Sequence, residues 1–470
     1  MFHLTRNGCI GLVIGLTAIA CLSAVGVQIV PAQTAAPGQP PASKALGRSK
    51  FIQTFAVKLR GGEKIVPGDE KLFSKFDMVM LTRTWSDAIH GDTWRAIRSV
   101  NPATEIYIQT EGPTLWKEAD ESTIKDLKDV GRYDNSRGHS MGAINKDHPE
   151  FFLLDKNGKR CLAYEPEYKD RYLMDFGSGD YQKYWIEAIT ADVLKQPWRG
   201  TGIHVDNIGP LCTFPTGKPA KYDTDDKWSN AVLSFVDNVT GAMHKQGCRV
   251  WINAGGTDSD RGWKALVQLD VLQNPPDVVG EEGAFATSWG KGDTSFPIEK
   301  KWKHSVDFLS KLRKSRQAYF SHTKLRRDGT GTDNYGKSVT FWQSLWFAMC
   351  SYLLGKDDQL SNAYFFFCSR EGGGYGAKNC WFDEYERIDL GKAADLYKSV
   401  EHGGANVYWR EFAKGYVFVN PTERDAMGIP IPGPSRQLSH DNFKNDHKML
   451  KPINRIDLPA HHGTILLKAE

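Results

Sequence analysis

The stretch Thr201–Asn207, TGIHVDN, decides the predicted fold. Its β-branched and apolar composition is typical of one buried strand, and the strand ends on a carboxylate. Successive side chains of a strand point to opposite faces, so Ile203 and Val205 share one face while His204 and Asp206 share the other. If helices cover the outer face, Asp206 points inward. That is where a parallel barrel carries its chemistry.

A second stretch of the same form is Asp277–Gly283, DVVGEEG, which also runs from β-branched residues into acid. Two carboxylates at strand ends are what cleavage of a glycosidic bond requires. One protonates the leaving oxygen, and the other acts as nucleophile or as a base for water. Side-chain alternation leaves both Glu281 and Glu282 open as the second carboxylate, since either could face the interior. A sugar-cleaving enzyme is the leading hypothesis.

Short apolar runs that alternate with helical patterns predict the architecture. The helices are clearest over residues 181–194, 227–245, 298–315 and 338–354. The strands are predicted at residues 78–82, 105–110, 172–175, 202–206, 249–253, 278–282, 318–322 and 363–368. A count of eight predicts an α/β fold of the (β/α)8 TIM-barrel type. An open doubly wound sheet is the alternative, but no glycine fingerprint follows an early strand.

Two regions depart from this alternation. Asp155–Gly158, DKNG, lies between apolar runs and predicts a tight hairpin beside the barrel mouth. After the predicted barrel over residues 51–402, short β runs replace the helices, with a loop expected over the Pro-rich residues 429–434. Residues 403–470 are therefore predicted to form a small C-terminal antiparallel β subdomain.

The first 50 residues are typical of an exported protein. Arg6, an apolar run from Cys9 to Val30 and small residues up to Ala32 predict a signal peptide over residues 1–32. Residues 33–50 are rich in Ala, Pro, Gly and Ser, which predicts a flexible linker. The expected location is secreted or periplasmic. The alternative is an uncleaved N-terminal segment that anchors the protein in a membrane.

Composition narrows the class of partner. The 60 basic and 56 acidic residues give a net charge of +4, with no dense Lys/Arg block that would follow a phosphate backbone. The 14 Trp residues are many, and flat rings suit the apolar faces of sugars as well as protein cores. We therefore expect a carbohydrate substrate, no nucleic acid and no membrane contact beyond the leader. Among the cysteines after the leader, Cys368 and Cys380 form the best local pair for a disulfide.

Four short motifs, in a fixed order, resemble TIM-barrel glycoside hydrolases related to the endo-α-1,4-polygalactosaminidases and, more distantly, to the α-galactosidase clan. They are RYLMDF at 171–176, GIHVDN at 202–207, EG at 282–283 and FAKGYVFVNP at 412–421. The resemblance implies a catalytic Asp after the fourth strand and a catalytic acid after the sixth. Asp206 takes the first place, as nucleophile or base. Glu281 or Glu282 takes the second, and the following Gly283 favours Glu282.

Polar groups at the other strand ends are expected to bind sugar hydroxyls, because the carboxyl ends of barrel strands meet at one opening. The substrate-binding candidates are Trp85, Glu111, Asp175, His204, Asn207, Asn253 and His322. Structural roles compete with this interpretation for two of them. Asp175 could stabilise a turn, and His204 could be a hydrogen-bonded core histidine.

Two alternatives to a glycosidase stay open. A metal-dependent hydrolase could use His204, Asp206, Asp258 and His322, although residues 78–84 lack the His-x-His with which amidohydrolase barrels begin. A non-catalytic carbohydrate-binding barrel would keep the cleft without a working acid pair. The sequence favours a glycoside hydrolase that cleaves O-glycosidic bonds of a poly- or oligosaccharide without cofactor or metal.

Overall fold

The computed structural model describes most of the chain after residue 50. The described residues are 51–58, 68–81, 91–116, 141–164, 168–191, 200–214, 217–255, 260–356, 363–369 and 377–469. The predicted signal peptide and linker, together with Trp85 and Asp258, lie outside these ranges. Within them, no helix combines the length and the apolar character that crossing a bilayer requires.

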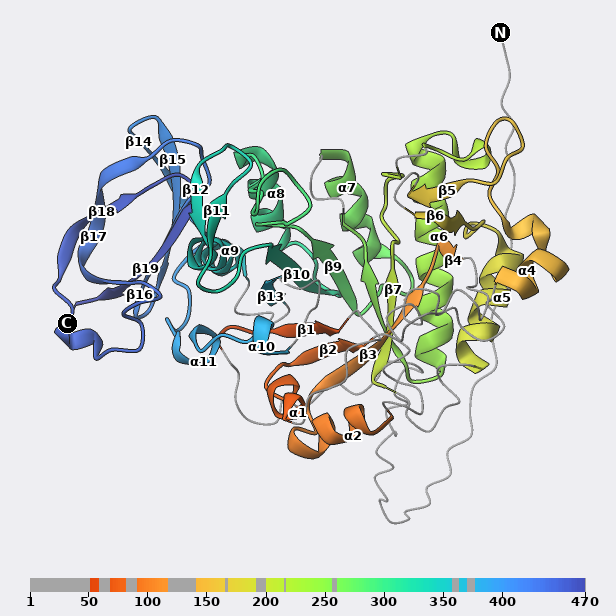
Figure 1. The fold of residues 1–470 in the computed structure, drawn as a ribbon, viewed down its shortest axis with the longest axis horizontal. Helices are drawn as coiled ribbons and strands as arrows, with labels where there is room; N and C mark the ends of the chain where they lie inside the picture. The colour runs from red at the N-terminus through yellow and green to blue at the C-terminus, as the bar shows by residue number, and fades with distance from the viewer. Residues whose placement is uncertain are drawn as a thin grey trace, which may run out of the picture. The chain divides into compact units, whose positions relative to one another are not determined.

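The core is an eight-stranded sheet in which every neighbouring pair is parallel (Figure 1). In spatial order its strands are β1 (Phe55–Lys58), β2 (Met78–Leu81), β3 (Glu105–Glu111), β7 (Gly202–Asp206), β8 (Arg249–Asn253), β9 (Val278–Glu282), β10 (Arg316–Thr323) and β13 (Ala363–Ser369). A parallel bridge between Thr54 and Phe365 joins the last strand to the first. The predicted (β/α)8 barrel is confirmed.

Helices connect the barrel strands. They are α1 (Asp69–Phe73), α2 (Gly91–Val100), α5 (Gly179–Ile189), α6 (Asp225–Lys245), α7 (Asp260–Gln268), α8 (Glu299–Phe308) and α9 (Phe341–Gly355). Two short helices, α10 (Ala377–Cys380) and α11 (Glu384–Arg387), follow the last barrel strand. Helix α6 begins where the Thr224 hydroxyl accepts the backbone N–H of Lys227 at 3.2 Å. Helix α9 is buried along nearly its whole length, because it packs against β10 and β13 on one side and against β16 and β19 of the C-terminal sheet on the other.

One predicted barrel strand belongs to another sheet. Residues 172–175 were expected as the third barrel strand. Instead β6 (Tyr168–Leu173) is the centre of a three-stranded antiparallel sheet with β4 (Thr114–Trp116) and β5 (Leu162–Tyr164). The apolar run at residues 172–174 is too short to show whether a strand alternates, so it does not separate an antiparallel strand from a barrel strand. The strand that the sequence analysis missed is β1, whose FAVK run is only four residues long.

The predicted hairpin is confirmed and belongs to the same inserted sheet. The N–H of Asp155 donates to the carbonyl of Lys159 at 2.8 Å, and the Asp155 carboxylate accepts the backbone N–H groups of Asn157 and Lys159. This asparagine-glycine turn leads into β5. Helix α4 (Met141–Asp147) and the 3-10 turn Pro149–Phe151 precede it. The insertion follows β3, so it starts at the carboxyl end of the barrel.

The C-terminal part is a six-stranded antiparallel sheet. Its strands, in spatial order, are β14 (Lys398–His402), β15 (Ala405–Phe412), β16 (Gly415–Asn420), β19 (His462–Lys468), β17 (Ala426–Leu438) and β18 (Ile453–Leu458). The sheet begins at Lys398, a few residues before the predicted start of the subdomain. The loop expected over residues 429–434 is part of β17. Its prolines fall where the pairing with β18 is irregular between Pro430 and Ser435, which is where a strand tolerates proline.

The six cysteines after the predicted leader are all described, and all are thiols. The expected disulfide between Cys368 and Cys380 is therefore not formed. Proximity in sequence does not bring two Cβ atoms into disulfide geometry. Here Cys368 is buried in β13 and Cys380 ends the short helix α10.

Buried ions close the amino end of the barrel. Glu105, at the start of β3, pairs with Arg249 at 2.6 Å and with Arg316 at 2.8 Å, and accepts the Tyr107 hydroxyl at 2.7 Å. Burial alone would raise the pKa of Glu105. The two guanidinium groups outweigh that cost and hold the pKa at about 2. This cluster ties the starts of β3, β8 and β10 together, at the end of the barrel opposite Asp206.

Candidate active site

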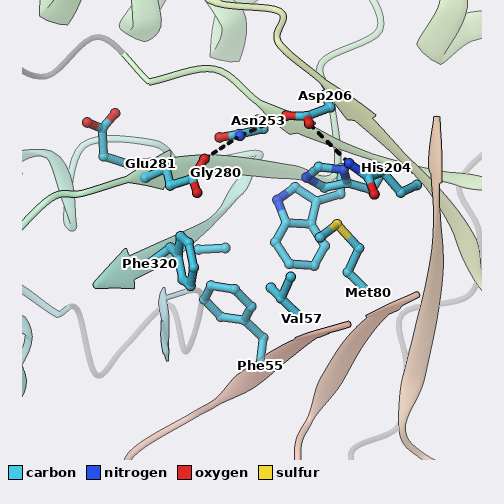
Figure 2. Close-up of a pocket in the computed structure, with 13 residues that line it drawn as sticks. Phe55, Val57, Met80, His204, Asp206, Asn253, Gly280, Glu281 and Phe320 are labelled. Carbon is cyan, nitrogen blue, oxygen red and sulfur yellow. Dashed lines mark hydrogen bonds between the residues drawn. The ribbon is translucent and has the colours of Figure 1, made fainter. Parts of the chain in front are cut away.

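Asp206 and Glu282 lie at the same end of the barrel, on either side of β8. Asn253, the last residue of β8, stands between them (Figure 2). Its side-chain Nδ2 donates to Oδ1 of Asp206 at 2.9 Å and to Oε2 of Glu282 at 3.1 Å. Because both oxygens bond to one nitrogen, they are at most about 6 Å apart. The predicted meeting of Asp206 with one of the two glutamates is present.

Three N–H donors fix the Asp206 carboxylate. Besides Asn253, the side-chain amide of Gln109 donates to Oδ2 at 3.1 Å, and the backbone N–H of Asn207 donates to Oδ1 at 2.9 Å. Asn207 has a φ of 59°, in the left-handed region that asparagine tolerates better than most residues. Its side chain donates to Glu111 at 3.1 Å. The strained turn thus holds the catalytic candidate in one orientation.

The structure separates the two adjacent glutamates. Glu282 faces the barrel interior, where Asn253 contacts it. Glu281 is only 5% exposed, and its carboxylate points away from Asp206 and from the aromatic side chains below it (Figure 2). On that outer face it contributes, after burial, to raising the pKa of Tyr319. Geometry therefore favours Glu282 as the partner of Asp206.

A cavity of about 50 Å³ lies beneath the carboxylates. Its floor is apolar and is formed by Phe55, Val57, Met80 and Phe320, while Asp206 and Asn253 stand at the opposite, polar side (Figure 2). Polar groups above an apolar floor are typical of a small-molecule site. A floor without polar groups also lowers the local dielectric, which strengthens the electrostatic effect of both carboxylates.

His204 lines this cavity one inward step below Asp206. It is 4% exposed, and its ring meets Trp251 edge to face at 4.9 Å. Burial lowers the pKa of His204 to about 3, so the imidazole is neutral at ordinary pH. It can shape the cavity floor, but it brings no positive charge to Asp206.

Of the remaining candidates, Glu111 supports the position of Asp206, and Asp175 lies next to the inserted sheet. Glu111 does not line the cavity; it is held by Arg171, by the Thr114 hydroxyl at 2.7 Å and by Asn207, and so braces the turn after Asp206. Asp175 follows β6 of the inserted sheet and bonds to Lys221 at 2.5 Å and to the Tyr222 hydroxyl. Because β6 belongs to the inserted sheet, the expectation that Asp175 ends a barrel strand is wrong.

His322, near the end of β10, is fully buried and is not among the residues that line the cavity. Its Nδ1 accepts the backbone N–H of Ser288 at 2.9 Å, so it anchors the connection after β9. Among the described residues, no three His, Cys, Asp or Glu side chains gather in a way that could hold a metal ion.

Sequence reasoning missed Gln109 and the apolar floor of the cavity. Gln109 lies in register with His204 on the neighbouring strand and bonds directly to Asp206. Counting alternate residues back from Glu111 would have found it. Phe55 was missed because the strand that carries it, β1, was not predicted.

The sequence profile of the family described as hypothetical glycosyl hydrolase family 15 matches residues 125–416 of this chain, which is more than half of its 470 residues. The chain belongs to this family. The matched span contains Asp206, Asn253 and Glu282. This membership of hypothetical glycosyl hydrolase family 15 confirms the predicted resemblance to glycoside hydrolases.

Several solved structures are similar to this member of the family. A GH36 α-galactosidase from Geobacillus stearothermophilus has 9% identity and a TM-score of 0.43, over 89% of this chain and 56% of that one. A trehalose-6-phosphate hydrolase from Bacillus licheniformis has 11% identity and a TM-score of 0.45, over 90% and 100%. An isomaltulose synthase from Erwinia rhapontici has 9% identity and a TM-score of 0.46, over 90% and 100%. The chain thus spans just over half the length of the α-galactosidase. No curated protein matches the sequence.

Proposed function

We propose that the protein hydrolyses O-glycosidic bonds of a poly- or oligosaccharide, with Asp206 as nucleophile and Glu282 as general acid and base. One observation carries this proposal: the Asn253 amide bonds to both carboxylates at the edge of the cavity. The bonded oxygens are at most about 6 Å apart. Retaining glycosidases place the carboxyl groups about 5–5.5 Å apart, and inverting enzymes about 6.5–9.5 Å apart. The separation therefore supports a retaining mechanism.

In the first step, the protonated Glu282 gives its proton to the leaving oxygen while an oxygen of Asp206 attacks the anomeric carbon. The bond to the leaving group breaks, and a glycosyl ester of Asp206 forms. In the second step, Glu282 takes a proton from a water molecule, which attacks the same carbon and releases Asp206. Asn253 directs both carboxylates towards one point throughout, so the reacting groups need little reorganisation.

A retaining mechanism predicts the configuration of the product. The first sugar released should carry the same anomeric configuration as the bond that was cleaved, because two displacements at one carbon restore it. A panel of polysaccharides with product analysis identifies the substrate. Proton NMR in the first minutes of the reaction then reads the anomer before mutarotation. Protein carrying Asp206→Ala serves as the blank for contaminating hydrolases, and an inverted first product would contradict the assignment of Asp206 as nucleophile.

We also propose that the enzyme is exported, on the strength of the basic, apolar and small-residue order up to Ala32. The mature protein should then lack residues 1–32. Mass spectrometry of the N-terminal peptide measures this directly. Intact Met1 recovered from the membrane fraction would instead support an uncleaved anchor.

A further inference from the structure

An exposed tryptophan stands at the rim of the barrel. Trp289 is 55% exposed. It belongs to the connection between β9 and α8, which begins directly after Glu282. Large aromatic side chains are normally buried, as Trp185 and Trp228 are here. Exposure of a single apolar side chain is common, so what matters is where Trp289 lies relative to the carboxylates and the cavity.

A row of rings connects this indole to the cavity. Phe320 forms part of the cavity floor and lies in register with Glu282 on the neighbouring strand. The Phe320 ring lies 4.9 Å from the His322 ring, and the His322 ring lies 4.6 Å from the Trp289 ring. The rings of Phe320, His322 and Trp289 are therefore in contact one after another, from the floor of the cavity to the protein surface. Trp289 is close enough to meet a second sugar of a bound chain.

The turn that carries Trp289 is held on both sides. Thr287 and Ser295 exchange backbone hydrogen bonds of 3.0 and 2.8 Å across its base. The backbone N–H of Asp293 donates to the carbonyl of Thr332 at 2.7 Å, which ties the turn to the connection after β10. Ser288, next to the tryptophan, donates to His322. A ring presented on a fixed turn loses little conformational freedom when it binds a ligand.

The order of the strands shows on which side of the two carboxylates Trp289 lies. Around the mouth come Asp206 on β7, Asn253 on β8, Glu282 on β9 and then β10, where His322 lies against Trp289. A general acid protonates the oxygen of the leaving group, so the leaving sugar lies on the far side of Glu282 from Asp206. β10 and Trp289 lie on that side of Glu282.

We propose that Trp289 is the stacking platform for the sugar that leaves, so that the preferred substrate is a glycan with a pyranose ring on the leaving side of the bond. This inference rests on the proposed function. The apolar face of a pyranose fits a flat indole, and the arrangement selects sugar leaving groups over small ones. Trp289 therefore determines specificity and takes no part in the proton transfers.

The test compares two substrates of the sugar that the polysaccharide panel identifies. One is an oligosaccharide, which places a sugar on Trp289, and the other is the glycosyl fluoride, whose leaving group is a single atom. Trp289→Ala should lower kcat/KM for the oligosaccharide about 10-fold and leave the fluoride unchanged. Trp289→Tyr keeps a flat ring and should restore most of the loss. Ile298→Ala, which removes an exposed apolar side chain from the same connection, is the matched control and should change neither rate.

Three outcomes would overturn the inference. An equal loss on both substrates would mean that Trp289 shapes the carboxylate site, and no loss on either would mean that it binds no sugar. If the wild-type protein cleaves neither substrate, the proposed function fails first and the inference falls with it. The melting temperature of each variant should equal that of the wild type, because the removed groups are exposed.

Discussion

Replacement of Asp206 by Ala is expected to abolish hydrolysis of both natural and activated glycosides, with a loss in kcat of about 10⁴-fold or more. Among the described residues, the neighbouring carboxylates cannot replace Asp206, since Glu111 is turned towards Arg171 and the side chain of Glu281 points away from Asp206. Initial rates on an aryl glycoside and on the natural glycan measure the effect. Asp206→Asn, which keeps the shape of the side chain, should be as inactive as Asp206→Ala.

The same variant distinguishes catalysis from simple binding. In an enzyme, Asp206→Ala should still bind the glycan in affinity electrophoresis while forming no product. A non-catalytic carbohydrate-binding barrel would form no product even as wild type, and the substitution would only weaken its binding. Substantial turnover by Asp206→Ala would refute its role as nucleophile.

Replacement of Glu282 by Ala is expected to slow cleavage of natural glycosides by about 10² to 10⁴-fold. A sugar is a poor leaving group and needs the proton of the acid. An aryl glycoside with an activated leaving group needs less help, so Glu282→Ala should retain far more of its rate on that substrate. The ratio of kcat/KM on the two substrates, compared with wild type, is the measurement.

Glu281→Ala provides the matched control for this experiment. The two glutamates are adjacent and chemically identical and both line the cavity, but their side chains point to opposite faces of β9, and Asn253 bonds to the Glu282 carboxylate. Glu281→Ala should show no selective loss on natural glycosides. If instead Glu281→Ala showed that loss and Glu282→Ala behaved as wild type, the inferred facing of the sixth barrel strand would be wrong by one residue.

The sequence predicts seven of the eight barrel strands and misses β1, which is buried but only four residues long. The runs ending at Asp206 and Glu282 are unambiguous, because β-branched residues lead directly into acid. Residues 172–175 are misleading, because a strand of the inserted sheet has a similar composition. The barrel gains β1, which was not predicted, and loses residues 172–175, so the number of barrel strands is still eight. Asp206 and Glu282 therefore still end the fourth and sixth strands, as the resemblance implies.

The site is predictable from side-chain alternation only in part. Alternation puts Asp206 inside, and Asn253 follows from its place at a strand end. Alternation alone cannot choose between Glu281 and Glu282, because both faces of β9 are compatible with its short apolar run. The positions of Glu111 and Asp175 depend on Arg171, Lys221 and Tyr222, which come from elements distant in sequence. Such contacts have no local signature.

The bridge between Thr54 and Phe365 has a consequence for how the chain folds. It joins the first barrel strand to the last, so β1 keeps an open edge until nearly the whole barrel domain has been synthesised. Joining segments so far apart in sequence carries a loop-closure cost in entropy and makes the barrel a topology of high contact order, which slows folding. During that interval the edges of β1 and β10 can pair with other chains. Closure of the barrel by β13 is thus the step that covers the open edges of the barrel sheet.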